Sequence, residues 1–161
     1  EVSVETPLET AKCYMVSGRS VGVVPILRAG LGMVSGVQKL IPNAKVGHIG
    51  LYRDHDTHEP VEYYCKLPAD AEQRTLIVVD PMLATGMSME IAYKALLSHG
   101  QPACTHLVCA FATPQAIEHL QTTMPEDCTL WCAVIDPILN PHKYIVPGLG
   151  DAGDLCFGGK L

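Results

Sequence analysis

The 161-residue sequence lacks the features that mark several protein classes. Its longest apolar run, Val21 to Leu27, is too short to span a bilayer, and no basic-then-apolar leader opens the chain. Lys and Arg are scattered and the net charge is −6, so the basic face typical of nucleic-acid binders is missing. We therefore expect no membrane and no nucleic acid as partner. A small anionic ligand needs only local amides and one or two Arg residues.

Cysteine is present, but not in a disulfide or metal pattern. The seven cysteines are odd in number and include no CxxC pair. Several lie in apolar, strand-like runs, where a thiol behaves as a small hydrophobic group. This favours reduced structural thiols over disulfides or a metal cluster. The segment HDTH, His55 to His58, could suggest a metal, but the polar residues around it indicate a solvated turn.

The composition, 48% hydrophobic and 17% charged, indicates a globular chain of one domain, residues 1–161. Continuous apolar runs alternate with helical patterns, which predicts an α/β fold with a mainly parallel twisted sheet and helices on both faces. The segment HDTHEPVEYYCKLP lies between two strands and predicts a small strand excursion or hairpin. The expected strands are Val21–Leu27, Val46–Tyr52, Val61–Lys66, Thr75–Asp80, His106–Phe111 and Leu130–Ile135, and the expected helices are Leu31–Leu40, Ser88–His99 and Pro114–Gln121.

The C-terminal stretch YIVPGLGDAGDLCFGG is too rich in glycine for a helix or a long strand. Its apolar residues, among them Tyr144, Ile145 and Phe157, are too numerous for a solvated tail. We therefore expect an ordered loop that folds over a site. In parallel sheets, ligands bind beyond the carboxyl ends of the strands, and polar residues follow several of the expected strands there. These are Arg28 to Gly32, Arg53 with Asp54, Asp80 to Ser88, and Asp136.

The segment VVDPMLATGMS combines a buried strand, an acid and a loop that enters a helix. Asp80 could accept hydrogen bonds from sugar hydroxyls, and Thr85 and Ser88 supply hydroxyl donors. Gly86 lets the backbone approach a phosphate, which the amides of the helix N-terminus would bind. An ordinary capped helix is the alternative explanation. No GK[ST] follows, so the loop is not a Walker motif.

The segment VVPILRAGLG places Arg28 beside Gly30 and Gly32, an arrangement that suits a diphosphate. An overlapping segment, GLGMVS from Gly30 to Ser35, resembles a dinucleotide fingerprint that would use Asp54 as its acid. The third small position is Ser35 rather than Gly or Ala, so this match is weak. Arg53 ends the next expected strand in GLYRD, where a surface Arg is the simple explanation. A third loop at the same sheet edge favours a functional role.

The motifs VVPILRAGLGM, IGLYRD, EPVEYYCKLP, VDPMLATG and YIVPGLGDAGD together resemble the uracil phosphoribosyltransferase family, from about Val21 to the C-terminus. The resemblance implies the type I phosphoribosyltransferase fold in a chain that lacks the family's N-terminal segment. It implies transfer of the phosphoribosyl group of 5-phospho-α-D-ribose 1-diphosphate to uracil, which gives UMP and diphosphate. Mg²⁺ would be carried on the diphosphate, with no direct protein ligand. A homo-oligomer, a nucleotide effector and a cytoplasmic location are also implied.

The resemblance assigns roles by position. Asp80, Arg53 and Asp151 would be catalytic. The ribosyl diphosphate would be held by Arg28, Arg53, Asp80, Pro81, Met82, Leu83, Ala84, Thr85, Gly86, Met87, Ser88 and Asp151. Uracil would be read by Ile145, Gly150, Asp151 and Ala152, largely through main-chain groups. The transition state would resemble an oxocarbenium ion, so stabilising the leaving diphosphate matters more than a nucleophile.

Several residues depart from the family pattern. Met87 replaces a Gly of the usual TGGS, Lys143 stands where a Gly precedes the Tyr, Ser35 replaces an Asp, Leu155 a basic residue and Gly159 a Thr. If the loop needs φ > 0 at position 87, Met there costs about 1–2 kcal/mol relative to Gly. We expect a measurable phosphate-binding defect from crowding by Met87. A non-catalytic relative on the same fold is the main alternative, and a dinucleotide-binding oxidoreductase is a remote one.

Overall fold

The computed structural model describes residues 1–16, 20–53 and 60–159, without the side chains of Arg53 and Pro60. A central sheet has the strand order β10-β9-β7-β3-β5-β6, and the short strands β4 and β8 pair with β3 and β9. All neighbours in it are parallel except β5 and β6. The strands are β3 (Val21–Leu27), β4 (Lys45–Val46), β5 (His48–Arg53), β6 (Pro60–Lys66), β7 (Thr75–Val79), β8 (Met82–Leu83), β9 (Cys104–Ala112) and β10 (Cys128–Ile135). The expected mainly parallel sheet is confirmed.

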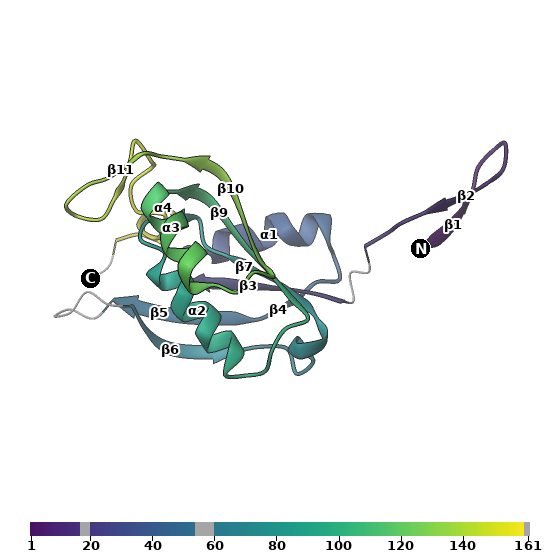
Figure 1. The fold of residues 1–161 in the computed structure, drawn as a ribbon, viewed down its shortest axis with the longest axis horizontal. Helices are drawn as coiled ribbons and strands as arrows, with labels where there is room; N and C mark the ends of the chain where they lie inside the picture. Colours follow the sequence, from purple (N-terminus) through teal and green to yellow (C-terminus); the bar gives the residue numbers. More distant parts are fainter. Residues whose placement is uncertain (17–19, 54–59, 160–161) are drawn as a thin grey trace.

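Helices cover both faces of this sheet (Figure 1). Side chains alternate along a strand, so Val23 of β3 packs in one cluster with Val34 of α1 (Leu31–Leu40). Val24 faces the other way and packs with residues of α2 (Met87–Leu97) and α3 (Pro114–Thr123). Burial on both faces explains why β3 reads as an unbroken apolar run. In the described part of the chain, no helix is long and apolar enough to cross a membrane.

The predicted excursion is an antiparallel hairpin of β5 and β6 at one edge of the sheet. Residues 54–59 lie outside the described residues, and with them the predicted HDTH turn. The expected helix Leu31–Leu40 agrees with α1 at both ends. Helix α2 begins at Met87 rather than Ser88 and ends at Leu97. All seven cysteines are free thiols.

The glycine-rich C-terminus is ordered, but one expectation about it is wrong. It contains a helix, α4 (Ala152–Phe157), as well as the short antiparallel pair β11 (Ile138–Leu139) and β12 (Ile145–Val146). The helix forms because the Asp151 side chain accepts a hydrogen bond from the Asp154 amide, 2.9 Å away. This cap outweighs the low helix propensity of Gly153.

The N-terminal residues form a separate hairpin of β1 (Val2–Glu5) and β2 (Thr10–Cys13). Within the described residues, these strands pair only with each other. The hairpin projects away from the sheet as an arm (Figure 1). The separation of this hairpin from the main sheet was not predicted from the sequence.

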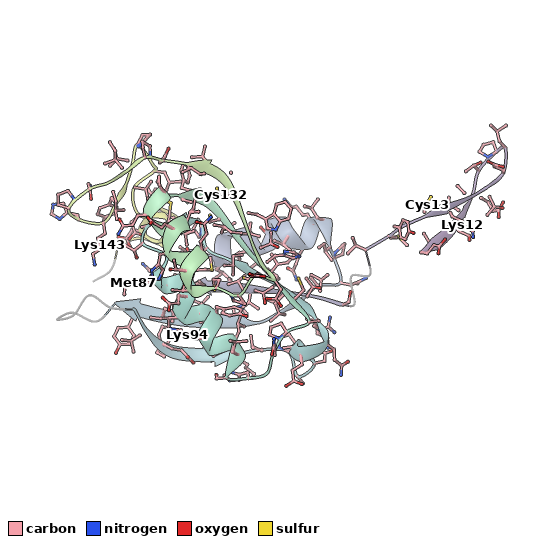
Figure 2. The ribbon with its side chains drawn as sticks, viewed as in Figure 1. Lys12, Cys13, Met87, Lys94, Cys132 and Lys143 are labelled. Atoms are coloured by element: carbon pink, nitrogen blue, oxygen red, sulfur yellow. The ribbon has the colours of Figure 1, made fainter. Side chains whose placement is uncertain are left out.

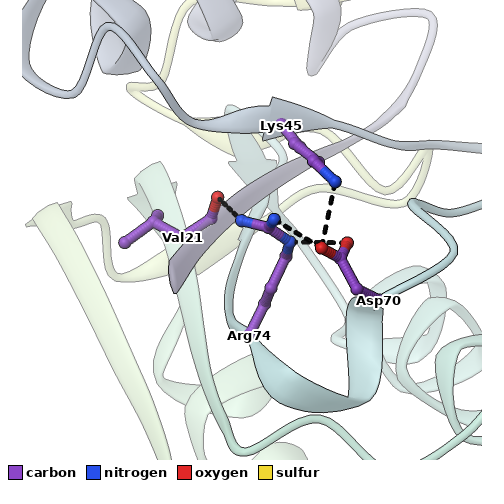
Figure 3. A network of polar contacts seen from close by, with 4 residues as sticks. All are labelled: Val21, Lys45, Asp70 and Arg74. Carbon is purple, nitrogen blue, oxygen red and sulfur yellow. Dashed lines mark hydrogen bonds and ion pairs between the residues drawn. The ribbon is translucent and has the colours of Figure 1, made fainter. Parts of the chain in front are cut away.

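The amino ends of the strands are joined by a polar network (Figure 3). Arg74 follows the short helix η2 (Ala71–Gln73) and donates from Nη1 to the Val21 carbonyl, 3.2 Å away. Its Nε and Nη2 donate to the two carboxylate oxygens of Asp70 at 2.8 and 2.6 Å, and Lys45 Nζ donates to Asp70 at 3.0 Å. The network therefore ties the start of β3 to the segments before β5 and β7.

Candidate active site

Loops from five parallel strands gather at one edge of the sheet. Because β3, β5, β7, β9 and β10 run parallel, their carboxyl ends lie at the same edge. Arg28 follows β3, Arg53 ends β5, and Asp80 follows β7. Figure 2 places Met87 and Lys143 at this end of the molecule, opposite the arm that carries Lys12 and Cys13. The topology therefore brings the predicted loops to one edge, although the Arg53 side chain lies outside the described residues.

The loop after β7 surrounds a small hollow. The Met82 amide donates to Asp80 Oδ1 at 3.5 Å, which turns the chain back after the strand. β8 then pairs with the end of β9, so the loop is anchored on both sides. The hollow is lined by Asp80, Met82, Leu83, Ala84, Thr85, Gly86, Ser88 and Met89. Of the residues 80–88 expected to hold the ribosyl diphosphate, Pro81 and Met87 are not in this lining. Arg28 and Asp151, expected in the same role, are not in it either, and the Arg53 side chain lies outside the described residues.

Gly86 carries the left-handed backbone that the loop requires, with φ of 84°. A Cβ there would lie 2.9 Å from Cδ2 of His119 and 3.1 Å from the Ala116 carbonyl oxygen. Gly86 is the N-cap of α2 and supplies no side chain, so no side-chain cap hydrogen bond is made. The first amides of α2 therefore remain available to an anion.

Met87 does not have the backbone conformation that was considered for it. It is the first residue of α2, and Lys143 is the only non-glycine residue with positive φ in the described ranges. The left-handed turn falls one residue earlier, at Gly86. The backbone cost that a left-handed Met87 would carry therefore does not apply, whereas crowding of a phosphate by the Met87 side chain remains a prediction.

Thr113, which lies outside the motif, holds the loop after β7 in place. It is 1% exposed, and its Oγ1 donates to the Ala84 carbonyl at 2.7 Å. The same oxygen accepts from the Ala116 amide at 3.0 Å, and the Thr113 amide donates to the Leu83 carbonyl at 3.1 Å. The sequence motif gave no sign of this role for Thr113, because its contact with Ala84 joins residues 29 positions apart.

The loop after β3 packs tightly against the sheet. A Cβ at Gly30 would overlap the Val79 carbonyl oxygen and the backbone of Ile26. This close approach explains the glycine without a dinucleotide, and Asp54, the acid of that alternative, lies outside the described residues. Arg28 Nη2 donates to Asp154 Oδ1 at 3.1 Å and to the Gly158 carbonyl at 3.4 Å. The loop after β3 is therefore in direct contact with α4.

The loop expected to read uracil is held in place by two side chains that precede it in the sequence, Asp136 and Asn140. The Gly148 amide donates to Asp136 Oδ2 at 2.9 Å, and the buried Asp136 follows β10. Asn140 Oδ1 accepts from the amides of His142 and Tyr144 at 3.0 and 2.9 Å. Asp136 was noted in the sequence for its place at the sheet edge, but Asn140 was missed. Together these contacts fix the turn that precedes Ile145 and Gly150.

The expected uracil residues differ in exposure. Ile145 is buried in β12, and Ala152 is buried at the start of α4. Gly150 is exposed, has φ of 85°, and would place a Cβ in open space. Asp151 uses Oδ1 to cap α4. The main-chain groups between β12 and α4 are therefore presented by a short, ordered turn.

Two cysteine thiols of the central sheet are poor nucleophiles. Burial raises the pKa of Cys109 to about 12, with smaller contributions from Cys132 and Asp80. Burial also raises the pKa of Cys128 to about 11. Both thiols stay protonated at neutral pH, which is consistent with a structural role.

A larger groove of about 470 Å³ lies along α2 and the end of α3, away from Asp80 and Arg28. Glu90 borders it and accepts from Lys94 Nζ at 2.6 Å and from His119 Nε2 at 2.7 Å. Lys94 first, and then His119, hold the pKa of Glu90 below its usual range against the opposing effect of burial. The His119 contact links α2 to α3 beside Gly86, whereas the Lys94 pair lies within α2.

Comparison with known proteins matches almost the whole chain. A family model described as uracil phosphoribosyltransferase matches residues 1–159. The uracil phosphoribosyltransferase of Alkaliphilus metalliredigens is 56% identical over 160 residues, which are 99% of this chain and 76% of that protein. That of Clostridium perfringens strain SM101 is 54% identical with the same two coverages.

Solved structures show the same fold. The AQ2163 protein of Aquifex aeolicus is similar with a TM-score of 0.85 and 34% identity, over 98% of this chain and 74% of that one. A purine phosphoribosyltransferase of Pyrococcus horikoshii has a TM-score of 0.54 and 16% identity, over 75% of this chain and 80% of that one. The second likeness concerns the fold alone.

Proposed function

The chain belongs to the uracil phosphoribosyltransferase family, and on that premise we propose that the site at the carboxyl edge of the sheet carries out this transfer. The reaction moves the 5-phosphoribosyl group from 5-phospho-α-D-ribose 1-diphosphate to uracil, which yields UMP and diphosphate. The observation that carries the proposal is the uncapped start of α2 beside the hollow at Asp80, with Arg28 on the adjoining loop.

The phosphate and ribose are assigned to the loop after β7. Amides of the first turn of α2 bind the 5′-phosphate, with Thr85 and Ser88 as hydroxyl donors in the same lining. Asp80 accepts hydrogen bonds from the ribose hydroxyls, because an ionised carboxylate is an acceptor only. Pro81 to Ala84 shape the turn between these groups. The loop is thus suited to a phosphate ester of a sugar.

The leaving diphosphate is assigned to Arg28 and Arg53. Both follow or end neighbouring strands, and a guanidinium binds phosphate oxygens through a planar fork of donors. In the transfer, the bond between the ribose C1 and the diphosphate oxygen breaks, and uracil N1 bonds to C1 as it gives up its proton to the departing diphosphate or to water. Negative charge grows on the diphosphate, and cations fixed in advance stabilise it. No covalent enzyme intermediate is needed.

The donor set fits Mg²⁺ carried by the substrate rather than caged by protein. Asp80 and Asp151 are hard oxygen donors, and no group of three or more His, Cys, Asp or Glu suited to a metal occurs in the described ranges. Mg²⁺ bound to substrate phosphates through one or two carboxylates keeps several waters. When bound, the ion neutralises charge on the diphosphate. Asp151 Oδ2 faces no partner among the described residues and could serve such a water.

Uracil is assigned to the turn between β12 and α4. Its Watson–Crick edge presents a donor between two carbonyl acceptors, which main-chain groups at Ile145, Gly150, Asp151 and Ala152 can complement. The contacts of Asp136 and Asn140 keep this turn in place before the base arrives. Cytosine reverses the pattern at N3 and C4, so it should be rejected.

We also propose a homo-oligomer, a nucleotide effector and a cytoplasmic location. The oligomer is supported by the projecting arm and its exposed apolar side chains. The location is supported by the substrate, because a charged sugar phosphate does not cross a membrane unaided. The effector rests on the family resemblance alone.

The test is a direct assay of product. Purified protein with Mg²⁺ and the ribosyl diphosphate should form UMP from uracil, and turnover of cytosine should be lower by about 10⁴ or more. Binding of the ribosyl diphosphate without UMP formation would identify a non-catalytic relative instead. Binding of NAD without the ribosyl diphosphate would favour the oxidoreductase alternative.

A further inference from the structure

Arg28 is held by α4 through one of its nitrogens. Nη2 donates to Asp154 Oδ1 at 3.1 Å and to the Gly158 carbonyl at 3.4 Å. Among the described residues, no contact is recorded for Nη1 or Nε of Arg28. A guanidinium carries five N–H donors in a fixed plane, so holding Nη2 leaves the donors on Nη1 and Nε for a ligand.

Helix α4 packs through small residues against the loop after β3, Arg28 to Gly32, which we call the diphosphate loop because of its proposed role. A Cβ at Gly153 would lie 3.8 Å from the Ala29 Cβ, and one at Gly32 would lie 3.8 Å from Cys156 Sγ. Ala152 and Gly153 are buried. The backbone of Asp154 is fixed as well, because its amide donates to Asp151 and its carbonyl accepts from the Gly158 amide at 2.9 Å. The carboxylate therefore starts from a well-defined position.

We propose that Asp154 is a positioning residue for the transfer: its carboxylate orients Arg28 so that the remaining guanidinium donors receive the diphosphate. The inference rests on the proposed function. The side chains of Arg28 and Asp154 are 40% and 38% exposed, and ion pairs that are this exposed contribute little to folding. The Arg28–Asp154 ion pair instead restricts the conformations of the Arg28 side chain. Without it, this long side chain would be ordered only when substrate binds.

The same contact links the two substrate loops. Asp151 and Ala152 belong to the turn assigned to uracil, and Asp154 is one helical turn further along α4. Arg28 and Ala29 belong to the diphosphate loop. The role of Asp154 is nevertheless specific to the diphosphate, because its side chain contacts Arg28 and not the turn from Gly148 to Gly150.

The experiment compares Asp154→Ala and Asp154→Asn with the unchanged protein. The ribosyl diphosphate with Mg²⁺ is titrated by calorimetry, and KM for each substrate and kcat are measured. Asp154→Ala should weaken binding of the ribosyl diphosphate by roughly two- to twelve-fold, the cost of ordering one long side chain. Asp154→Asn keeps an acceptor oxygen and should lose less. KM for uracil and the melting temperature should hardly change.

A double-mutant cycle with Arg28→Ala isolates the contact. In the Arg28→Ala background, Asp154→Ala should have no further effect on affinity. Glu118→Gln, at an exposed position on α3, is the matched control for a lost surface carboxylate. Tighter binding by Asp154→Ala would mean that the carboxylate competes with diphosphate, and unchanged binding would mean that it does nothing. Either result overturns the inference, as does an undiminished effect in the Arg28→Ala background.

Failure of the proposed transfer and failure of the positioning role of Asp154 can be distinguished, because the first is seen in the unchanged protein and the second only in its variants. If the unchanged protein forms no UMP, the proposed function fails before any variant is considered. If it forms UMP and Asp154→Ala binds the ribosyl diphosphate normally, only the positioning role fails. A loss of uracil affinity equal to the loss of diphosphate affinity would show general damage to α4, and it also overturns the specific role.

Discussion

Lys143 is the only non-glycine residue in the described ranges with a positive φ, 62°. It lies in the turn between β11 and β12, and its amide donates to the Asn140 carbonyl at 2.8 Å. The left-handed conformation brings Cβ close to the following carbonyl oxygen, which Gly avoids. The family pattern of Gly at this position thus has a direct structural reason.

Replacing Lys143 by Gly should stabilise the protein. Relief of the left-handed strain gives about 1–2 kcal/mol, and the greater freedom of Gly in the unfolded chain removes part of it. We expect a net gain of about 0.5–1 kcal/mol in the free energy of urea unfolding. Lys143→Ala removes the same charge but keeps a Cβ, so it should give no gain. Equal stability of the Gly and Ala variants would contradict the explanation.

Substitution by Ala should harm position 86 and be tolerated at position 87. Gly86→Ala places a Cβ against His119 and the Ala116 carbonyl in a left-handed backbone, so it should displace the loop. We expect a loss of about 1–2 kcal/mol in stability and weaker binding of the ribosyl diphosphate. Met87→Ala keeps a good helix former at the first position of α2 and should be stable.

Met87→Gly separates backbone strain from crowding. It relieves no left-handed strain, because Met87 has none, and Gly lowers helix propensity by about 1 kcal/mol. A gain in ribosyl-diphosphate affinity shared by Met87→Gly and Met87→Ala would therefore come from removal of the thioether side chain. An affinity unchanged in both variants would show that the side chain points away from the phosphate.

At the scale of elements, the sequence predicted the limits of those strands and helices whose residues are buried in a regular pattern. The limits of β3 and α1 follow from an apolar run buried on both faces and from a periodic stripe ended before Pro42. The loops at the carboxyl edge follow from the parallel order. Contacts between distant residues were not predictable in this way. Thr113 with Ala84 and Arg28 with Asp154 join segments whose separation in sequence carries no local signal.

The short elements α4, β11 and β12 were not predicted from the sequence, for a different reason. Helix α4 has six residues, two of them Gly or Asp, and its stability comes from the Asp151 cap and from packing on the diphosphate loop. Propensity summed over so few residues is uninformative. Similarly, β11 and β12 have two residues each. The Asn140 side chain holds the turn between them, and the Asp136 side chain holds the segment after β12.

The network at the amino edge should make stability depend on pH (Figure 3). Hydrogen bonds from Arg74, and then from Lys45, hold the pKa of Asp70 well below its usual range. The carboxylate of an unfolded chain takes up its proton near pH 4. The stabilising contribution is therefore complete above that value, and it is lost as the pH falls from there towards the lower pKa of the folded state.

Asp70→Asn should remove this dependence. The variant should melt at a lower temperature than the unchanged protein at pH 7, because Arg74 and Lys45 lose their charged partner. The difference should shrink as the pH is lowered from 5 to 3. Asp127→Asn, at an exposed position before β10, serves as the matched control and should follow the unchanged protein. A difference that stays constant down to pH 3 would argue against the network.

The whole molecule has its candidate site at one end and the arm at the other (Figures 1 and 2). The arm and the segment after it expose large apolar side chains: Leu8 is 95%, Tyr14 88%, Met15 73% and Val16 70% exposed. Monomeric proteins seldom leave such side chains grouped in water, and a second copy of the chain is the partner proposed above. The described site residues all lie outside the arm.

Removing these apolar groups should therefore shift assembly more than substrate binding. Tyr14→Ser with Met15→Ser should lower the molar mass measured by light scattering across a dilution series, because less apolar surface is buried between copies. Leu40→Ser, which removes an 85% exposed side chain at the end of α1, is the control and should leave the mass unchanged. The double variant should still bind the ribosyl diphosphate, since Arg28 and the loop after β7 are contributed by one chain. An unchanged protein that is monomeric at every concentration, or a double variant that assembles normally, would remove the arm from the proposed interface.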